Sequence, residues 1–357
     1  MPTEAPTPLG GIEAPTHTSD PTIQFPFIAS NRAFSLPKVE GDYQSVTEDG
    51  DLSYHSFSGK TLKNPEGYDA WMSNIVNSPL SRSGSRVMIF IHGYYNKWEH
   101  VTKTWDDATN PNTYGLSGMV TNFHTLQSSH YPNTGPINAS YPGPVVLFDW
   151  PSYFEIKLPL CGSYRKAQEN AKLTADRSMP YLRRIIDDLR KNNKEVDVVS
   201  HSMGNLVFQQ GARLLTPGSV STVLNVAAAI PDYTYVRKFG VIFEGWGMLQ
   251  SLGDNRYADV LWSTHDTALP EAIVCDSSRT ELGLSGPAPG SINATSHDCS
   301  QWVKSEESPN GGQKNVHISY YFLQTTLDLM ISLLTKTSPT PTPTHPPTPP
   351  VTTPYAS

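Results

Sequence analysis

Residues 196–204 carry the pattern that is most suggestive of chemistry in this chain. An apolar run, Val-Asp-Val-Val, passes into Ser-His-Ser-Met-Gly and then into a segment that favours a helix, which places Ser202 at a tight turn. Such a turn lifts a serine hydroxyl clear of a sheet, beside a base and a helix N-terminus, and so makes it a useful nucleophile. Short patterns also arise by chance, and a serine before an apolar run often only caps a helix. Ser200 stands where glycine is usual, so the surrounding sequence must decide.

Three motifs follow one another in a fixed order. They are Ile91-His92-Gly93-Tyr94-Tyr95-Asn96, then Phe148-Asp149-Trp150-Pro151-Ser152, then Ser200-His201-Ser202-Met203-Gly204-Asn205. Together they resemble an uncharacterised, mostly bacterial branch of the α/β-hydrolase superfamily, which shows a His-Gly-Tyr-Asn turn, a Trp-Pro-Ser turn and a His-Ser-Met-Gly-Asn elbow. The segment 27–32 is similar to the opening strand of that branch, so the resemblance covers about residues 25–335.

Two positions depart from the branch, and they leave the substrate preference open. Tyr95 stands where asparagine is usual, and Ala167 stands where an acidic residue is expected. Neither departure touches the predicted catalytic groups.

The resemblance implies an α/β-hydrolase fold, a mostly parallel, doubly wound sheet with helices on both faces. The pattern of the residues agrees, because apolar runs at 87–91 and 145–148 suit strands that are buried on both faces of a sheet. An amphipathic helix at 180–189 then precedes the strand at 196, which is typical of a parallel sheet with right-handed connections. Active sites in such sheets lie beyond the carboxyl ends of the strands.

In this superfamily the turn after an early strand and the residue after the nucleophile supply two backbone N–H groups that bind an oxyanion. Here these donors are predicted to be Tyr94 and Met203. Gly93 could instead be an ordinary loop glycine, with His92 packed beneath it.

The acid of a Ser, acid, His series should follow the elbow at the end of a later strand. Asp232 ends the predicted strand 221–230, and Asp266 follows the next one, 257–263. The resemblance favours Asp266, because the acid usually comes after the second strand beyond the elbow. Either residue could also be an ordinary turn aspartate.

The base is predicted to be His317, which lies just before an amphipathic segment at 320–336. His297 is the competing histidine. It is expected in a long loop rich in serine, glycine and proline, where no apolar frame would hold an imidazole in register.

Composition predicts one large catalytic domain at 23–337, with a flexible segment at 1–22 and a disordered Pro/Thr-rich tail at 338–357. The net charge of −7 argues against general affinity for nucleic acid or for anionic membranes. No apolar run is long enough to span a bilayer, and the first twenty residues show no secretory signal. We therefore expect a soluble, cytoplasmic protein, whose oligomeric state the sequence leaves open.

Three cysteines, Cys161, Cys275 and Cys299, are too few for a disulfide framework. Cys275 and Cys299 flank the loop after Asp266 and could bridge it, but the expected cytoplasmic location favours reduced thiols.

These observations predict a serine hydrolase, most readily a carboxylic-ester hydrolase that forms an acyl-enzyme, with Ser202, Asp266 and His317 as its triad. Its partner would be a small acyl ester. No cofactor is expected, because the chain lacks a Gly-rich phosphate loop and histidines at metal-ligand spacing. Lipase, thioesterase and peptidase activities would use the same groups. A non-catalytic binding protein with the same fold is the alternative from another class.

Overall fold

The computed structural model describes twelve stretches of the 357-residue chain. They are 25–33, 45–58, 61–83, 85–102, 116–124, 140–154, 161–238, 241–242, 244–253, 257–275, 280–304 and 316–336. The segment 1–22, which the sequence predicts to be flexible, and the tail 338–357, which it predicts to be disordered, lie outside these residues.

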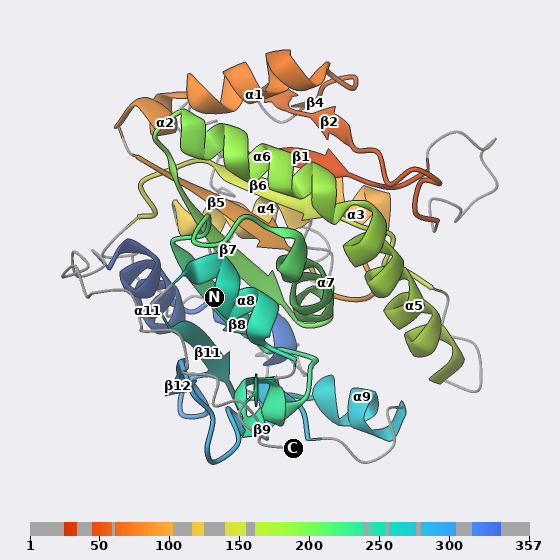
Figure 1. Ribbon diagram of the computed structural model, residues 1–357, viewed down its shortest axis with the longest axis vertical. Helices are drawn as coiled ribbons and strands as arrows, with labels where there is room; N and C mark the ends of the chain where they lie inside the picture. The colour runs from red at the N-terminus through yellow and green to blue at the C-terminus, as the bar shows by residue number, and fades with distance from the viewer. Residues whose placement is uncertain are drawn as a thin grey trace, which may run out of the picture.

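An eight-stranded sheet forms the centre of the protein (Figure 1). Its strands run in the order β12-β11-β8-β7-β5-β6-β1-β2, and every neighbouring pair is parallel except β1 and β2. The strands are β1 Phe27–Ser30, β2 Ser53–His55, β5 Arg86–Ile91, β6 Val145–Asp149, β7 Glu195–His201, β8 Thr222–Val226, β11 Ala258–Trp262 and β12 Ala294–Asp298. Two short hairpins lie outside this sheet: β3 Phe57–Ser58 with β4 Thr61–Leu62, and β9 Arg237–Lys238 with β10 Val241–Ile242.

The apolar side chains of the central strands alternate between two cores, one on each face of the sheet. On β5, Val87 and Ile89 belong to one core, whereas Met88 and Phe90 belong to the other. Helices α1 Tyr68–Val76, α5 Cys161–Arg177, α6 Met179–Lys191, α7 Gly204–Gly211, α8 Trp246–Leu252 and α10 Leu282–Ser285 contribute to the first core. Helices α3 Trp98–Thr102, α4 Leu116–Val120 and α11 Gln324–Thr335, with the 3-10 turns η1 Thr121–Phe123 and η4 Val316–Tyr321, contribute to the second.

This arrangement confirms the predicted mostly parallel, doubly wound sheet with helices on both faces. Helix α6 shows why the sequence folds locally as expected. Leu182, Ile185, Ile186 and Leu189 recur at helical spacing and are fully buried, while Pro180 occupies the first turn, where its missing N–H does no harm.

The chain reverses its direction of travel across the sheet at β5. From β5 it moves outward to β6, returns to β7 on the other side of β5, and then continues to β8, β11 and β12. The carboxyl ends of β5 and β7 therefore meet at a topological switch point, which is where open α/β sheets bind ligands. His92 and Ser202 directly follow these two strands.

Two expected elements differ from the structure. The strand after the elbow ends at Val226, short of the predicted residue 230, because Ala227 adopts a left-handed backbone with φ of 45° and turns the chain out of the sheet. His297 lies on the edge strand β12 and not in a loop, since hydrogen bonding to β11 imposes a strand on a polar sequence.

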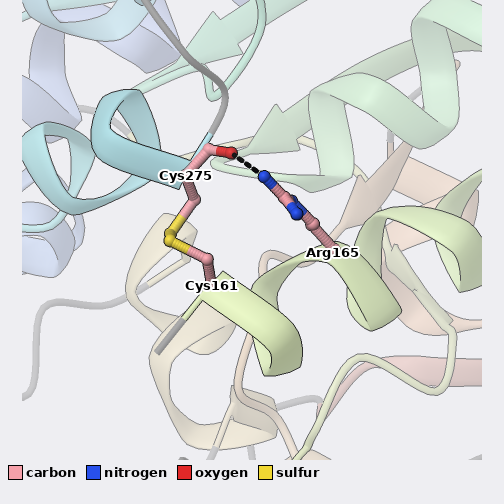
Figure 2. The surroundings of a disulfide bond; sticks show 3 residues. All are labelled: Cys161, Arg165 and Cys275. Carbon is pink, nitrogen blue, oxygen red and sulfur yellow. Dashed lines mark hydrogen bonds between the residues drawn. A yellow bond between two sulfur atoms is a disulfide. The ribbon is translucent and has the colours of Figure 1, made fainter. Parts of the chain in front are cut away.

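The prediction of reduced thiols is wrong for Cys275 and is confirmed for Cys299. Cys161 at the start of α5 is joined by a disulfide to Cys275 at the end of helix α9 Leu269–Cys275 (Figure 2). Arg165, one turn into α5, donates a hydrogen bond to the Cys275 carbonyl at 3.4 Å. The two cysteines are 114 residues apart, so proximity in the sequence gave no indication of this pairing. Disulfides persist in oxidising compartments, and the pairing gives the expected cytoplasmic location no support.

Cys299 is the third cysteine, and it is free and buried. Burial raises the pKa of its thiol to about 12, assisted by the neighbouring charge of Asp298. The thiol is therefore protonated at neutral pH and behaves as a small apolar side chain.

Candidate active site

Ser202 occupies a strained turn at the end of β7. Its φ of 53° lies in the left-handed region, which a residue with a side chain adopts only when its surroundings enforce it. The Ser202 N–H donates to the Val226 carbonyl at 3.1 Å, and the Ser202 carbonyl accepts from the Ala229 N–H at 3.1 Å. A Cβ added at Gly204 would lie 2.4 Å from the Ile91 carbonyl oxygen, so only glycine lets α7 start this close to β5. These are the features of a nucleophile elbow.

Ser200, which stands where the elbow pattern usually has glycine, has a structural role. Its hydroxyl donates to Asn205 Oδ1 at 2.7 Å, and Asn205 Nδ2 donates to the carbonyls of Ser200 and Ser202 at 3.0 Å each. The serine thus satisfies a buried amide that ties the strand to the first turn of α7.

Gly93 lies directly against the candidate nucleophile. A Cβ at Gly93 would be 2.6 Å from Ser202 Cβ and 3.2 Å from Ser202 Oγ. The two predicted oxyanion donors, the N–H groups of Tyr94 and Met203, belong to the residues that follow this pair in the sequence. Met203 precedes the first residue of α7, where backbone N–H groups have no partner within the helix.

His317 and Asp266 form a close pair. His317 Nδ1 lies 2.7 Å from Asp266 Oδ2, and the other carboxylate oxygen accepts the N–H groups of Ala268 and Leu269 at 2.9 and 3.1 Å. Burial raises the pKa of Asp266, but the charge and hydrogen bond of His317 and these backbone N–H groups outweigh it, so the pKa lies below the usual value. An ionised Asp266 makes Nδ1 the protonated nitrogen of His317, which leaves Nε2 able to accept a proton.

His201 is a residue of this site to which the sequence assigned no role. It precedes Ser202, its Nε2 donates to the His317 carbonyl at 3.1 Å, and the two imidazole rings lie 4.7 Å apart. Burial, reinforced by the charge of His317, lowers the pKa of His201 to about 3. A ring that stays neutral can hold the backbone of His317 near the elbow without competing for protons. Its place within the elbow motif was the one signal in the sequence.

The alternative acid and base lie elsewhere. Asp232 begins the 3-10 turn η3 Asp232–Tyr235, where its N–H donates to Thr280 at 2.9 Å and burial raises the pKa of its carboxyl. His297 Nε2, on the edge strand β12, lies 2.7 Å from Asp259 Oδ1 on the neighbouring strand β11. Among the contacts described here, His317 therefore pairs with Asp266, His297 pairs with Asp259, and Asp232 pairs with neither histidine.

A buried ionic network lies beneath the Gly93 turn. Arg32 binds Asp149 through Nε and Nη2, at 2.8 Å each to different carboxylate oxygens, and Ser30 donates to the same carboxylate. His92 bridges this pair to the turn, with Nε2 2.9 Å from Asp149 Oδ1 and Nδ1 2.9 Å from the Gly93 carbonyl. Arg32, His92 and Asp149 come from three different segments of the chain.

The network also holds the loop that follows Gly93. Arg32 Nη2 donates to the Asn96 carbonyl at 2.8 Å. Asn96 Nδ2 donates to the carbonyls of Gly93 and Tyr94, at 3.0 and 3.2 Å, and its N–H donates to Ser152 Oγ at 3.1 Å. Residues 93–96 are therefore fixed at both ends, and with them the orientation of the Tyr94 peptide.

In the parts of the chain that the structure describes, no group of three or more His, Cys, Asp or Glu is placed to hold a metal ion. Nor do those parts include a helix with both the length and the apolar character needed to cross a membrane.

Residues 69–304, about two thirds of the chain, match the family described as alpha/beta hydrolase of unknown function (DUF900). The chain belongs to this alpha/beta-hydrolase family. The match confirms the predicted membership of the α/β-hydrolase superfamily, and it agrees with the parallel sheet. No curated protein matches the sequence of this hydrolase.

The hydrolase depends on a buried carboxylate whose contribution to stability can be measured. Burial raises the pKa of Asp149, but Arg32 and the hydrogen bonds from His92 and Arg32 outweigh it and hold the pKa at about 2, below the ordinary 3.8. A depressed pKa stabilises the fold above the unfolded value, and that contribution is lost as pH falls from about 4 toward 2. Its size is about 2–3 kcal/mol, at 1.36 kcal/mol for each pKa unit between 3.8 and about 2.

We predict that Asp149→Asn lowers the free energy of unfolding at pH 7 by about 3–5 kcal/mol, because Arg32 is left buried without its partner charge. Urea unfolding between pH 7 and pH 2.5 measures this change. It also shows whether the variant lacks the part of the stability that the native protein loses when Asp149 is protonated. Asp69→Asn is the control, since that side chain is 98% exposed. An acid dependence of stability that is identical in Asp149→Asn and the native protein contradicts the assignment.

Proposed function

We propose that this protein is a serine hydrolase that cleaves carboxylic esters through an acyl-enzyme. Ser202 is the nucleophile, His317 the general base, and Asp266 the carboxylate that orients the base. The backbone N–H groups of Tyr94 and Met203 bind the oxyanion. The observation that carries the proposal is the 2.7 Å contact between His317 Nδ1 and Asp266 Oδ2, in a protein whose Ser202 occupies a strained elbow at the sheet's switch point.

The chemistry follows from the protonation states of these groups. With Nδ1 donating to Asp266, Nε2 of His317 takes the Ser202 proton as Oγ attacks the carbonyl carbon of the ester. Negative charge develops on the carbonyl oxygen, where two backbone N–H groups stabilise it. His317 then returns the proton to the departing alkoxide, which leaves an ester on Ser202. Water, deprotonated by the same histidine, releases the acid and restores the serine.

The buried network supports this proposal because oxyanion stabilisation depends on donors that are already in place before the reaction. Arg32, Asp149 and His92 fix the turn that carries the Tyr94 N–H, and the elbow fixes the N–H of Met203. Thioesters and amides react through the same steps, so the preference for oxygen esters is a further part of the proposal.

The first test is covalent labelling with a fluorophosphonate, which reacts with a serine activated by a base and an oxyanion hole. We expect the native protein to be labelled once, and Ser202→Ala to lose that label while keeping its fold. Ser73→Ala, which changes an exposed serine on α1, should label like the native protein. Labelling of Ser202→Ala at the native level would refute the assignment of the nucleophile.

The second test separates the two candidate acids. Asp266→Asn should lower kcat for a simple ester by about 10⁴-fold, by analogy with other serine triads, because the amide favours the wrong tautomer of the base. Asp232→Asn should lower kcat by less than about tenfold, since this carboxylate accepts from the backbone N–H groups of Asp232 and Tyr233 and His317 Nδ1 pairs with Asp266. Steady-state kinetics of both variants decide the matter, and the reverse ranking would assign the acid to Asp232.

A further inference from the structure

Four tyrosine rings lie in contact with one another, and one of them belongs to Tyr94, which directly follows Gly93 in the sequence. The ring centroids of Tyr95 and Tyr153 are 4.7 Å apart, those of Tyr94 and Tyr95 are 5.7 Å apart, and those of Tyr94 and Tyr164 are 5.9 Å apart. We call these four residues the tyrosine cluster. Its connection to the site is direct, because Gly93, which precedes Tyr94, packs against the Ser202 side chain.

Tyr95 is the member of the cluster whose conformation needs an explanation. Its φ of 70° lies in the left-handed region, where a bulky side chain is disfavoured and glycine or asparagine is common. The loop enforces this conformation, since the Tyr95 N–H donates to the Ser152 carbonyl at 3.1 Å. Yet Tyr95 is 41% exposed, so burial of its side chain compensates only part of the strain. Residues held in such conformations cluster at functional sites.

The neighbours of Tyr95 indicate what its exposed ring can bind. Lys97 Nζ lies 4.4 Å from the centre of the Tyr153 ring and already makes a cation–π contact there. Tyr94 is half-buried and packs against the core, which leaves Tyr95 as the most exposed ring of the cluster. Aromatic rings gain from offset or edge-to-face contact with another ring, beyond the area that they bury.

From this position and conformation we propose that Tyr95 is a specificity residue that stacks on an aromatic ring of the substrate. The inference rests on the proposed function, and it narrows the substrate class to esters that carry an aryl group near the scissile carbonyl. The tyrosine cluster supports the Tyr95 ring from one side, and the bound substrate covers the exposed part.

The test uses two pairs of esters that differ only in the aromaticity of one ring. Methyl phenylacetate and methyl cyclohexylacetate place the ring in the acyl group, whereas benzyl acetate and cyclohexylmethyl acetate place it in the alcohol. We expect the native protein to prefer the aromatic member of at least one pair by about 2- to 10-fold in kcat/KM. Tyr95→Asn should abolish this preference, mainly through KM, and Tyr95→Phe should keep it.

Thermal unfolding distinguishes this role from a structural one. Asparagine accepts the left-handed backbone more readily than tyrosine, so Tyr95→Asn should leave the Tm unchanged or raise it. Tyr257→Asn is the matched control, since Tyr257 is 58% exposed and directly precedes β11. Tyr257 therefore lies at the amino ends of the parallel strands, whereas Ser202 lies at their carboxyl ends. This control should leave both ester ratios unchanged. A lower Tm for Tyr95→Asn, with equal losses on all four esters, would overturn the proposal.

Fluorophosphonate labelling of Ser202 in the same samples separates the two levels of inference. If Ser202 is labelled and neither ester pair is discriminated, the role of Tyr95 is wrong and the proposed function stands. If Ser202 is not labelled, the proposed function fails, and binding of methyl phenylacetate to the Ser202→Ala protein, followed by NMR, still tests the ring contact. There Tyr95→Asn should weaken binding by about 2- to 10-fold, and unchanged binding would overturn the inference.

Discussion

The burial of one carboxylate, Asp149, imposes the constraint on which the rest of the site depends. An ionised carboxylate in a protein interior must be paired and hydrogen-bonded, so Asp149 requires Arg32 and His92 around it. Each of these partners also holds a neighbouring carbonyl, Arg32 that of Asn96 and His92 that of Gly93. Satisfying the buried charge therefore fixes the turn that faces Ser202.

The sheet topology brings the other groups to the same edge. The reversal at β5 places the Gly93 turn beside the elbow of β7, and β11 delivers Asp266 two strands farther along. Asp266 caps the start of α9, whose other end is joined by the disulfide to α5 (Figure 2). Helix α5 in turn carries Tyr164, which packs on Tyr94. The disulfide thus links the helix that begins beside Asp266 to the helix that packs beside Tyr94.

The sequence predicted the parts of the fold that local chemistry dictates. Buried strands such as β5 are continuous apolar runs, and the elbow has small residues two positions before and two positions after Ser202, so both are visible in one dimension. The pairing of Cys161 with Cys275 and the strand at His297 depend on which segments meet in space, which a single sequence does not encode locally. Arg32 ends the predicted opening strand and Asp149 belongs to the second motif, but their ion pair joins positions 117 residues apart. The left-handed backbone of Tyr95 was equally invisible, because tyrosine gives no signal for it.

The central claim is that Ser202 forms an acyl-enzyme, and rapid-quench mass spectrometry tests it most directly. The protein would be mixed with excess p-nitrophenyl acetate, quenched in acid within milliseconds to seconds, and analysed intact and after proteolysis. We expect a burst of p-nitrophenol, equal to at most one per protein, together with one acetyl group on the peptide that contains Ser202. Turnover of the ester with no acetyl group on that peptide at any quench time, or with the acetyl group on another residue, would contradict the claim.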